Sequence, residues 1–182
     1  MKAFTTVLFC AAVALAAPHA KRQNACFIVG NEVLPQEVAD IANGLANTIT
    51  CDANKPTIDG VPDVSSNGQT FSSIDFATSG QSPLAFALDL FATADVVADS
   101  DLEAFQDALN AYIATEIGLR SKGGNLAIKA PKFFLQFQIA RIERARGNDN
   151  GEVERQLEKV VQNANRQDQA LLDEVRRLAT VV

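Results

Sequence analysis

The fold is decided by the residues PKFFLQFQIARIERAR at positions 131–146. On a helix of 3.6 residues per turn, the first two turns of this stretch are apolar on nearly every side, as in a helix at the centre of a core. Pro131 suits a first helical position, and Gly147 suits the end of the helix. Apolar residues and glutamines alternate over 135–139, so a strand is the alternative. We favour the helix because the stretch is long and has few β-branched residues.

The first 22 residues have the pattern of a secretory leader. Lys2 precedes an apolar run over 7–17 that is too short to span a membrane, and Ala16 closes a small-x-small cleavage pattern. Lys21 and Arg22 follow as a dibasic processing site. We therefore predict a signal peptide at 1–16, a short pro-segment at 17–22 and a single helical domain at 23–182. The expected location is extracellular or in the cell wall.

The residue types left after this leader exclude several chemistries. His19 is the only histidine and is removed with the leader, so the mature chain lacks histidine. Ser-His-Asp and Cys-His catalysis, histidine-ligated metals and di-iron carboxylate bundles are thereby excluded. We expect no catalytic residue of these kinds, no metal and no cofactor, and a non-enzymatic protein is favoured over an enzyme.

Two cysteines remain in the mature chain. Cys26 and Cys51 form an even number in an oxidising compartment, which predicts a disulfide between them. A bridge of this loop length would stabilise the fold by about 3 kcal/mol in the chain-entropy model.

Charge is unevenly distributed along the mature chain. Residues 23–118 have one base, Lys55, and 14 acids, whereas residues 119–182 have 12 bases and 8 acids. The overall acidity argues against a nucleic-acid partner. The basic segment 120–146 is either neutralised against the acidic half or is a binding face for an anionic partner.

The remaining patterns predict a mainly α, irregular bundle of five to six helices with at most a few short strands. Ser82 caps one expected helix, Ser100 begins a capping box before another, and Gly118 ends the latter. A short hairpin pairing 57–61 with 70–76 is expected around Asn67-Gly68. Besides 131–146, the expected helices cover 35–49, 83–97, 102–117 and 152–182, the last as one broken helix or as two.

Phenylalanine is abundant on the apolar faces of three of these helices. The residues concerned are Phe86, Phe91, Phe105, Phe133, Phe134 and Phe137. A dense core is the plainer interpretation. The alternative is an apolar cavity that holds a small hydrophobic ligand.

Several runs of the sequence resemble a family of small secreted proteins of filamentous fungi that contain a domain of unknown function. The resemblance covers nearly the whole mature chain and implies secretion and a single domain, but no catalytic residues. It rests on CFIVGNEVLP (26–35), GVPDV (60–64), FSSIDFATS (71–79), PLAFALDLFATADVVAD (83–99) and AIKAPKFFLQFQIARI (127–142).

Three functions are compatible with this sequence. The first is a secreted non-enzymatic protein that acts at the cell surface, in the wall or on another extracellular partner, and an uncovered apolar or basic patch would mark its contact face. The second is a carrier of a small apolar ligand. The third is a carboxylate-based hydrolase, which requires two acids facing each other in a cleft, at least one with a raised pKa.

Overall fold

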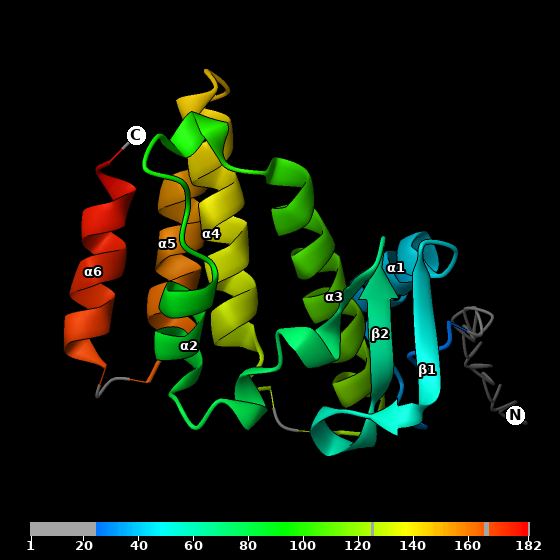
Figure 1. Ribbon diagram of the computed structural model, residues 1–182. Coiled ribbons are helices and arrows are strands. Elements are labelled where there is room, and N and C mark those ends of the chain that lie inside the picture. Colours follow the sequence, from blue (N-terminus) through cyan, green and yellow to red (C-terminus); the bar gives the residue numbers. More distant parts are fainter. Residues whose placement is uncertain (1–24, 125, 166–167, 182) are drawn as a thin grey trace, which may run out of the picture.

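The computed structural model describes residues 25–124, 126–165 and 168–181. This part of the chain forms a mainly helical fold with one small antiparallel sheet, as predicted (Figure 1). The signal peptide and the processing positions Ala16, Lys21 and Arg22 lie outside the described residues. The elements are α1 (Gln36–Leu45), β1 (Ile49–Pro56), β2 (Pro62–Ser66), β3 (Gln69–Thr70), α2 (Pro83–Leu90), α3 (Leu102–Ser121), α4 (Lys129–Ala145), α5 (Glu152–Asn163) and α6 (Gln169–Ala179).

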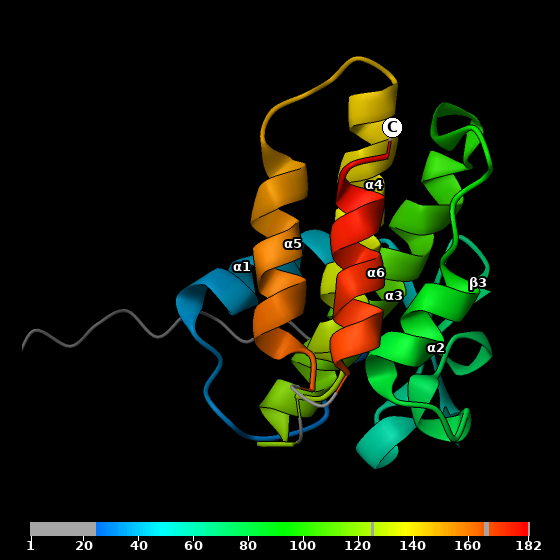
Figure 2. The ribbon, with the colours of Figure 1, turned by 90° about the vertical axis from the view of Figure 1, so that its left-hand side faces the viewer.

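Helix α4 is the centre of the fold, and the strand alternative for this stretch is wrong. Phe134, Leu135 and Phe137 are fully buried, because α4 packs against α2, α3 and α5 (Figure 1). An apolar surface on nearly all sides suits a helix covered by three others. α5 and α6 are two separate helices, and Figure 2 shows α6 in front with α5 and α2 on either side of it.

Helix α3 joins the helical part to the sheet, and its predicted ends need correction. Its N-cap is Asp101, whose side chain accepts from the amide of Ala104, whereas the sequence had suggested Ser100. The helix does not stop at Gly118 but continues to Ser121. A Cβ at Gly118 would lie 2.7 Å from the carbonyl oxygen of Phe27, so glycine serves here for close packing rather than for ending the helix.

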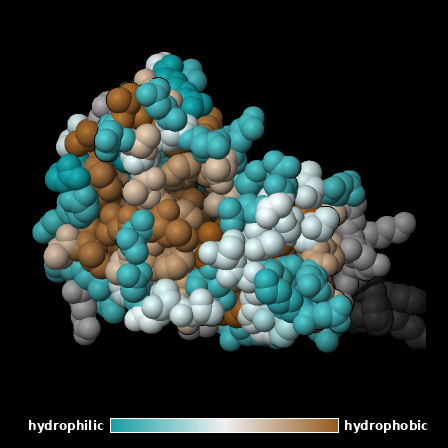
Figure 3. All heavy atoms as spheres, viewed as in Figure 1, coloured by the Kyte–Doolittle hydropathy of each residue, from teal (hydrophilic) through white to brown (hydrophobic). Residues whose placement is uncertain are grey.

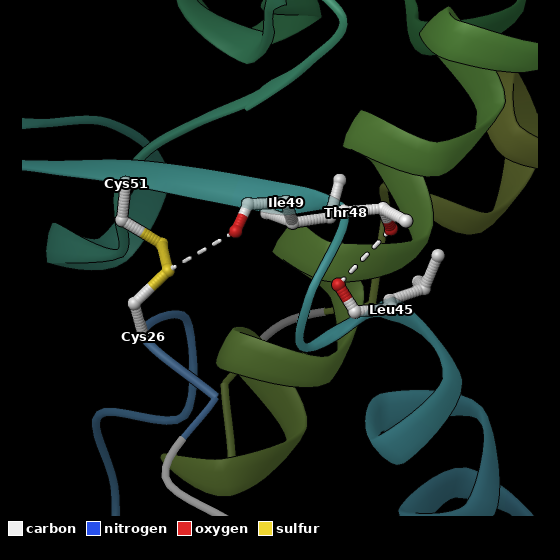
Figure 4. The surroundings of a disulfide bond; sticks show 5 residues. All are labelled: Cys26, Leu45, Thr48, Ile49 and Cys51. Atoms are coloured by element: carbon white, nitrogen blue, oxygen red, sulfur yellow. Dashed lines mark hydrogen bonds between the residues drawn. A yellow bond between two sulfur atoms is a disulfide. The ribbon is translucent and has the colours of Figure 1, made fainter.

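The N-terminal arm is tied to the sheet by the predicted Cys26–Cys51 disulfide, which the structure contains (Figure 4). Helix α1, between the two cysteines, is shorter than expected and ends at Leu45. Cys51 therefore lies within β1. Sγ of Cys26 is 3.9 Å from the carbonyl oxygen of Ile49. Since a bridged sulfur has no proton to donate, this is a van der Waals contact.

The predicted hairpin has the correct turn but different strands. Asn67 and Gly68 both have positive φ, 47° and 91°, as a tight two-residue hairpin turn requires. The turn joins β2 to β3, and β1 pairs with the other edge of β2. Residues 58–60, expected in a strand, form a 3₁₀ turn, so the chain between β1 and β2 is a tight corner.

Candidate functional site

Helix α2 and the chain that follows it differ from the single long helix that the sequence predicts. Ser82 caps α2 as predicted, with its Oγ 3.3 Å from the amide nitrogen of Ala85. The helix was expected to reach residue 97, but it ends at Leu90. The chain then continues without helical structure to the 3₁₀ turn Val97–Asp99. We call residues 91–100 the 91–100 segment.

Polar side chains of α4 hold the 91–100 segment in place. Nε2 of Gln138 donates to the carbonyl oxygen of Phe91 at 2.7 Å. At the other end of the segment, the guanidinium of Arg146 donates to the carbonyl oxygens of Ala98 and Ser100 at 2.9 and 2.8 Å. Buried backbone acceptors need such partners once a helix has ended. These bonds explain why the segment leaves the helical path yet stays in place.

Arg141 lies beneath the same segment and is 1% exposed. Its Nη1 donates to Oε1 of Gln138 at 2.7 Å, and its Nη2 donates to the carbonyl oxygen of Val181 at 3.3 Å. Within the described residues its Nε has no hydrogen-bond partner, and no carboxylate forms an ion pair with it. Burial lowers the pKa of Arg141, the neighbouring charges of Arg144 and Arg177 act in the same direction, and the charge of Glu174 opposes them. Gln138 therefore holds a buried cation as well as the segment.

With its backbone bound to α4, this region turns apolar side chains to the solvent. Leu90, Val96 and Val181 are 45%, 60% and 41% exposed. Ala92 and Ala94 are exposed as well. The space-filling view shows hydrophobic atoms gathered over α2 and the chain after it (Figure 3). We call Leu90, Ala92, Ala94, Val96 and Val181 the apolar face; exposed apolar patches often mark interaction sites.

Acidic residues accompany the apolar face along the chain. Asp89 and Asp95 flank its residues in sequence and Asp99 follows them, and all three are exposed. Arg146 also lies at this edge, but its guanidinium is bound to the carbonyl oxygens of the 91–100 segment. The face therefore combines exposed apolar side chains with neighbouring acidic ones.

The six phenylalanines of the predicted cavity do not form a single cluster of ring contacts. Phe86 and Phe91 meet edge to face, with ring centroids 6.3 Å apart, and Phe91 also contacts the ring of Tyr112. Phe134 and Phe137 form a separate pair, with centroids 5.9 Å apart. The remaining two, Phe105 and Phe133, are partly buried. The carrier hypothesis stays a prediction.

The basic segment 120–146 is largely engaged within the fold. Glu116 on α3 binds Nη2 of Arg120 at 2.7 Å and Nζ of Lys132 at 2.5 Å. Burial acts to raise the pKa of Glu116, but the two cations outweigh it and hold the pKa below its ordinary value. Glu116 thus pairs with two bases of this segment, while Arg141 and Arg146 donate to uncharged oxygens of the fold.

Neither a metal centre nor a membrane span is found in the part of the chain that the structure describes. No group of three or more potential metal-ligating side chains occurs within residues 25–124, 126–165 and 168–181. In the same ranges, none of the helices combines the length and the apolar character needed to cross a bilayer.

The chain belongs to the family described as a domain of unknown function, DUF7143, whose family model matches residues 28–182. The match covers nearly all of the described structure, including the apolar face. Searches of curated proteins and of solved structures found no match.

Proposed function

We propose that this family member is a secreted, non-enzymatic binding protein of a filamentous fungus, and that it docks an extracellular protein partner at the cell surface or wall through the apolar face. The single observation that carries the proposal is the exposure of Leu90, Val96 and Val181 on a backbone fixed by α4. A surface that is already ordered loses little conformational entropy on binding.

The proposed location is supported by features distant from this face. The leader-like residues 1–22 are typical of secretion, and a disulfide such as Cys26–Cys51 persists in oxidising compartments. The intact mass of the protein recovered from the culture medium tests this directly. A chain that starts at residue 17 or 23 supports secretion, whereas a chain retained in the cell with residues 1–22 intact contradicts it.

The proposed chemistry of the partner rests on the acids beside the face, since the bases near Val181, Arg176 and Arg177, are paired with Asp173 and Glu174. Asp89, Asp95 and Asp99 would repel an acidic partner and a second copy that presents the same acidic face. A protein surface with apolar side chains between lysines or arginines fits best. Because such charges steer association, binding should weaken as the salt concentration rises.

A pair of synthetic peptides tests this chemistry. One is an amphipathic peptide of leucine and lysine, and the other has glutamate in place of every lysine. Anisotropy of the labelled peptides should show saturable binding of the lysine peptide alone. Leu90→Asp and Val96→Asp should each weaken that binding by about tenfold or more, as expected for residues at the centre of an interface.

Val33→Asp is the matched control, because Val33 is 92% exposed and lies outside the apolar face. It should leave binding unchanged, and all variants should unfold at the wild-type urea concentration. Equal binding of both peptides, or an equal loss with Val33→Asp, would contradict the proposal. A dimer that Val96→Asp dissociates would show instead that a second copy covers the face.

A further inference from the structure

An open pocket of about 350 Å³, with a mainly apolar lining and a few polar groups, lies where the chain leaves β1. Its lining includes Lys55, Thr57 and Ile58 from the end of β1 and the corner after it, and Ser72, Asp75 and Thr78 from the 3₁₀ turns after β3. This volume is at the lower end of the roughly 300–1,000 Å³ typical of small-molecule sites. None of the six phenylalanines discussed above lines this pocket, so it is separate from the predicted apolar cavity.

Asp75 is a largely buried residue whose carboxylate takes part in the lining of this pocket. The residue is 6% exposed, and its Oδ1 accepts from the amide of Ala77 at 2.9 Å, which caps the 3₁₀ turn Phe76–Thr78. Its Oδ2 has no hydrogen-bond partner in the described part of the chain, whereas Asp75 itself lines the pocket. Burial raises the pKa of Asp75, and the charge of Asp63 adds to this effect. A carboxylate so poorly solvated gains from a ligand that donates a hydrogen bond.

Lys55 presents a donor at the same pocket and is fixed by two partners. Its Nζ donates to Oγ of Ser72 at 2.7 Å and lies 3.0 Å from Oδ2 of Asp63. An ammonium group has three protons, so one remains for a ligand. Lys55 is 58% exposed on its side chain, and its aliphatic stem and Ile58 add apolar surface to the pocket.

The second nearby carboxylate is occupied by the protein. Asp63 is 4% exposed, its Oδ1 accepts from the amide of Ser72 at 2.8 Å, and its Oδ2 accepts from the hydroxyl of Ser72 at 2.5 Å. Asp63 does not line the pocket. A hydrolase of the two-carboxylate type needs both acids free at the substrate. The arrangement therefore favours binding over hydrolysis.

We propose that this pocket binds a neutral, hydroxyl-rich ligand of the size of one sugar unit, with Asp75 accepting from one hydroxyl group and Lys55 donating to a neighbouring one. The apolar side chains of Pro56 and Ile58 would face the C–H groups of the ring. An anionic ligand is disfavoured, because Asp63 already balances the charge of Lys55 and Asp75 adds a negative charge.

An NMR titration of the ¹⁵N-labelled full domain with simple sugars tests the proposal. The probes are glucose, mannose, galactose and N-acetylglucosamine, with acetate and inorganic phosphate as anionic comparisons. At least one sugar should shift the amide signals of residues 55–58 and 72–78 saturably, and the anions should not. This readout needs no mutation, so it does not depend on whether any variant folds.

Variants then assign the contacts. Asp75→Asn keeps an oxygen to cap the turn but loses the charge, and Lys55→Met keeps the chain length but loses the donor. Each should weaken sugar binding by about tenfold or more, as expected for a hydrogen bond to a charged group. Glu37→Gln, which removes an exposed charge from α1, is the control and should bind as wild type.

Three results would overturn the proposal. They are the absence of saturable shifts at residues 55–58 and 72–78 with every sugar, binding of the anions in preference to the sugars, and wild-type affinity in both Asp75→Asn and Lys55→Met.

Discussion

The attachment of the 91–100 segment rests on Gln138, and replacing this residue by leucine tests the reasoning most severely. Gln138→Leu removes the bond to the carbonyl oxygen of Phe91 and leaves that oxygen without this donor. It also removes the shortest bond of Arg141, whose other acceptors lie at 3.3 and 3.5 Å. Losing a hydrogen bond to a charged group costs about 1.5–3 kcal/mol, and leaving the carbonyl oxygen of Phe91 unpaired adds about 1–3 kcal/mol. We expect a loss of this size in the free energy of unfolding.

Arg141→Met provides the contrasting perturbation. It removes the buried charge itself and replaces it by an apolar side chain of similar length, but it leaves Oε1 of Gln138 without its donor. We expect a loss of about 1–2 kcal/mol, smaller than that caused by Gln138→Leu. In the double variant Gln138→Leu/Arg141→Met, much of the damage caused by Gln138→Leu should be recovered, with a coupling energy of about 2 kcal/mol.

Urea unfolding of the four proteins, followed by circular dichroism at neutral pH, gives these free energies by linear extrapolation. Unchanged slopes would show that the comparison is valid. If Arg141→Met costs as much as Gln138→Leu, or if the two changes are additive, then Gln138 does not act as the hydrogen-bond partner of a buried charge and the reasoning fails.

Three further predictions concern other parts of the fold. The double change Cys26→Ser/Cys51→Ser should lower the free energy of unfolding by about 3 kcal/mol, measured against the oxidised wild type. Because two cations hold the pKa of Glu116 below its ordinary 4.5, its contribution to stability is present above that pH and lost as the pH falls through the folded-state value. Glu116→Gln should therefore flatten the acid side of the stability profile, and an unchanged profile would contradict this. Gly118→Ala should destabilise the fold, because the new Cβ would lie 2.7 Å from a backbone oxygen. Gly44→Ala, whose Cβ would have no atom within 4 Å, should stabilise the fold by about 0.5–1 kcal/mol in thermal unfolding. The opposite order of stabilities would contradict the packing argument.

The features that the sequence predicts correctly depend on local chemistry. The apolar surface of 131–146 indicates a buried helix wherever its neighbours lie, and Ser82 caps α2 through an amide only three residues away. The turn at Asn67-Gly68 is equally local. The pairing of the two cysteines follows from there being only two of them after the leader.

The errors arise where distant residues decide the local structure. α2 ends early because Gln138, 47 residues further on, binds the carbonyl oxygen of Phe91. α3 passes through Gly118 because the backbone of Phe27 packs there. Neither contact can be deduced from the hydrophobic periodicity of the sequence, so these helix boundaries could not have been predicted from it.

Sequence reasoning missed the apolar face and the pocket beside Asp75 for different reasons. The run over 83–97 is apolar on most sides, and sequence reasoning assigns such a run to the core. The alternation of Asp89 and Asp95 with apolar residues was the available sign that part of it is exposed. Asp75 and Lys55 come from segments that meet only in the folded chain, and among 14 acids in the first half nothing distinguishes Asp75.

The most direct test of the proposed function is a hydrogen–deuterium exchange footprint of the lysine peptide on the intact protein. Binding at the apolar face predicts slower exchange at residues 90–97 and near Val181. Residues 55–58 and 72–78 should be unchanged, and Val96→Asp should abolish the protection. Protection confined to other residues, or protection that persists in Val96→Asp, would contradict the assignment of this face as the docking surface.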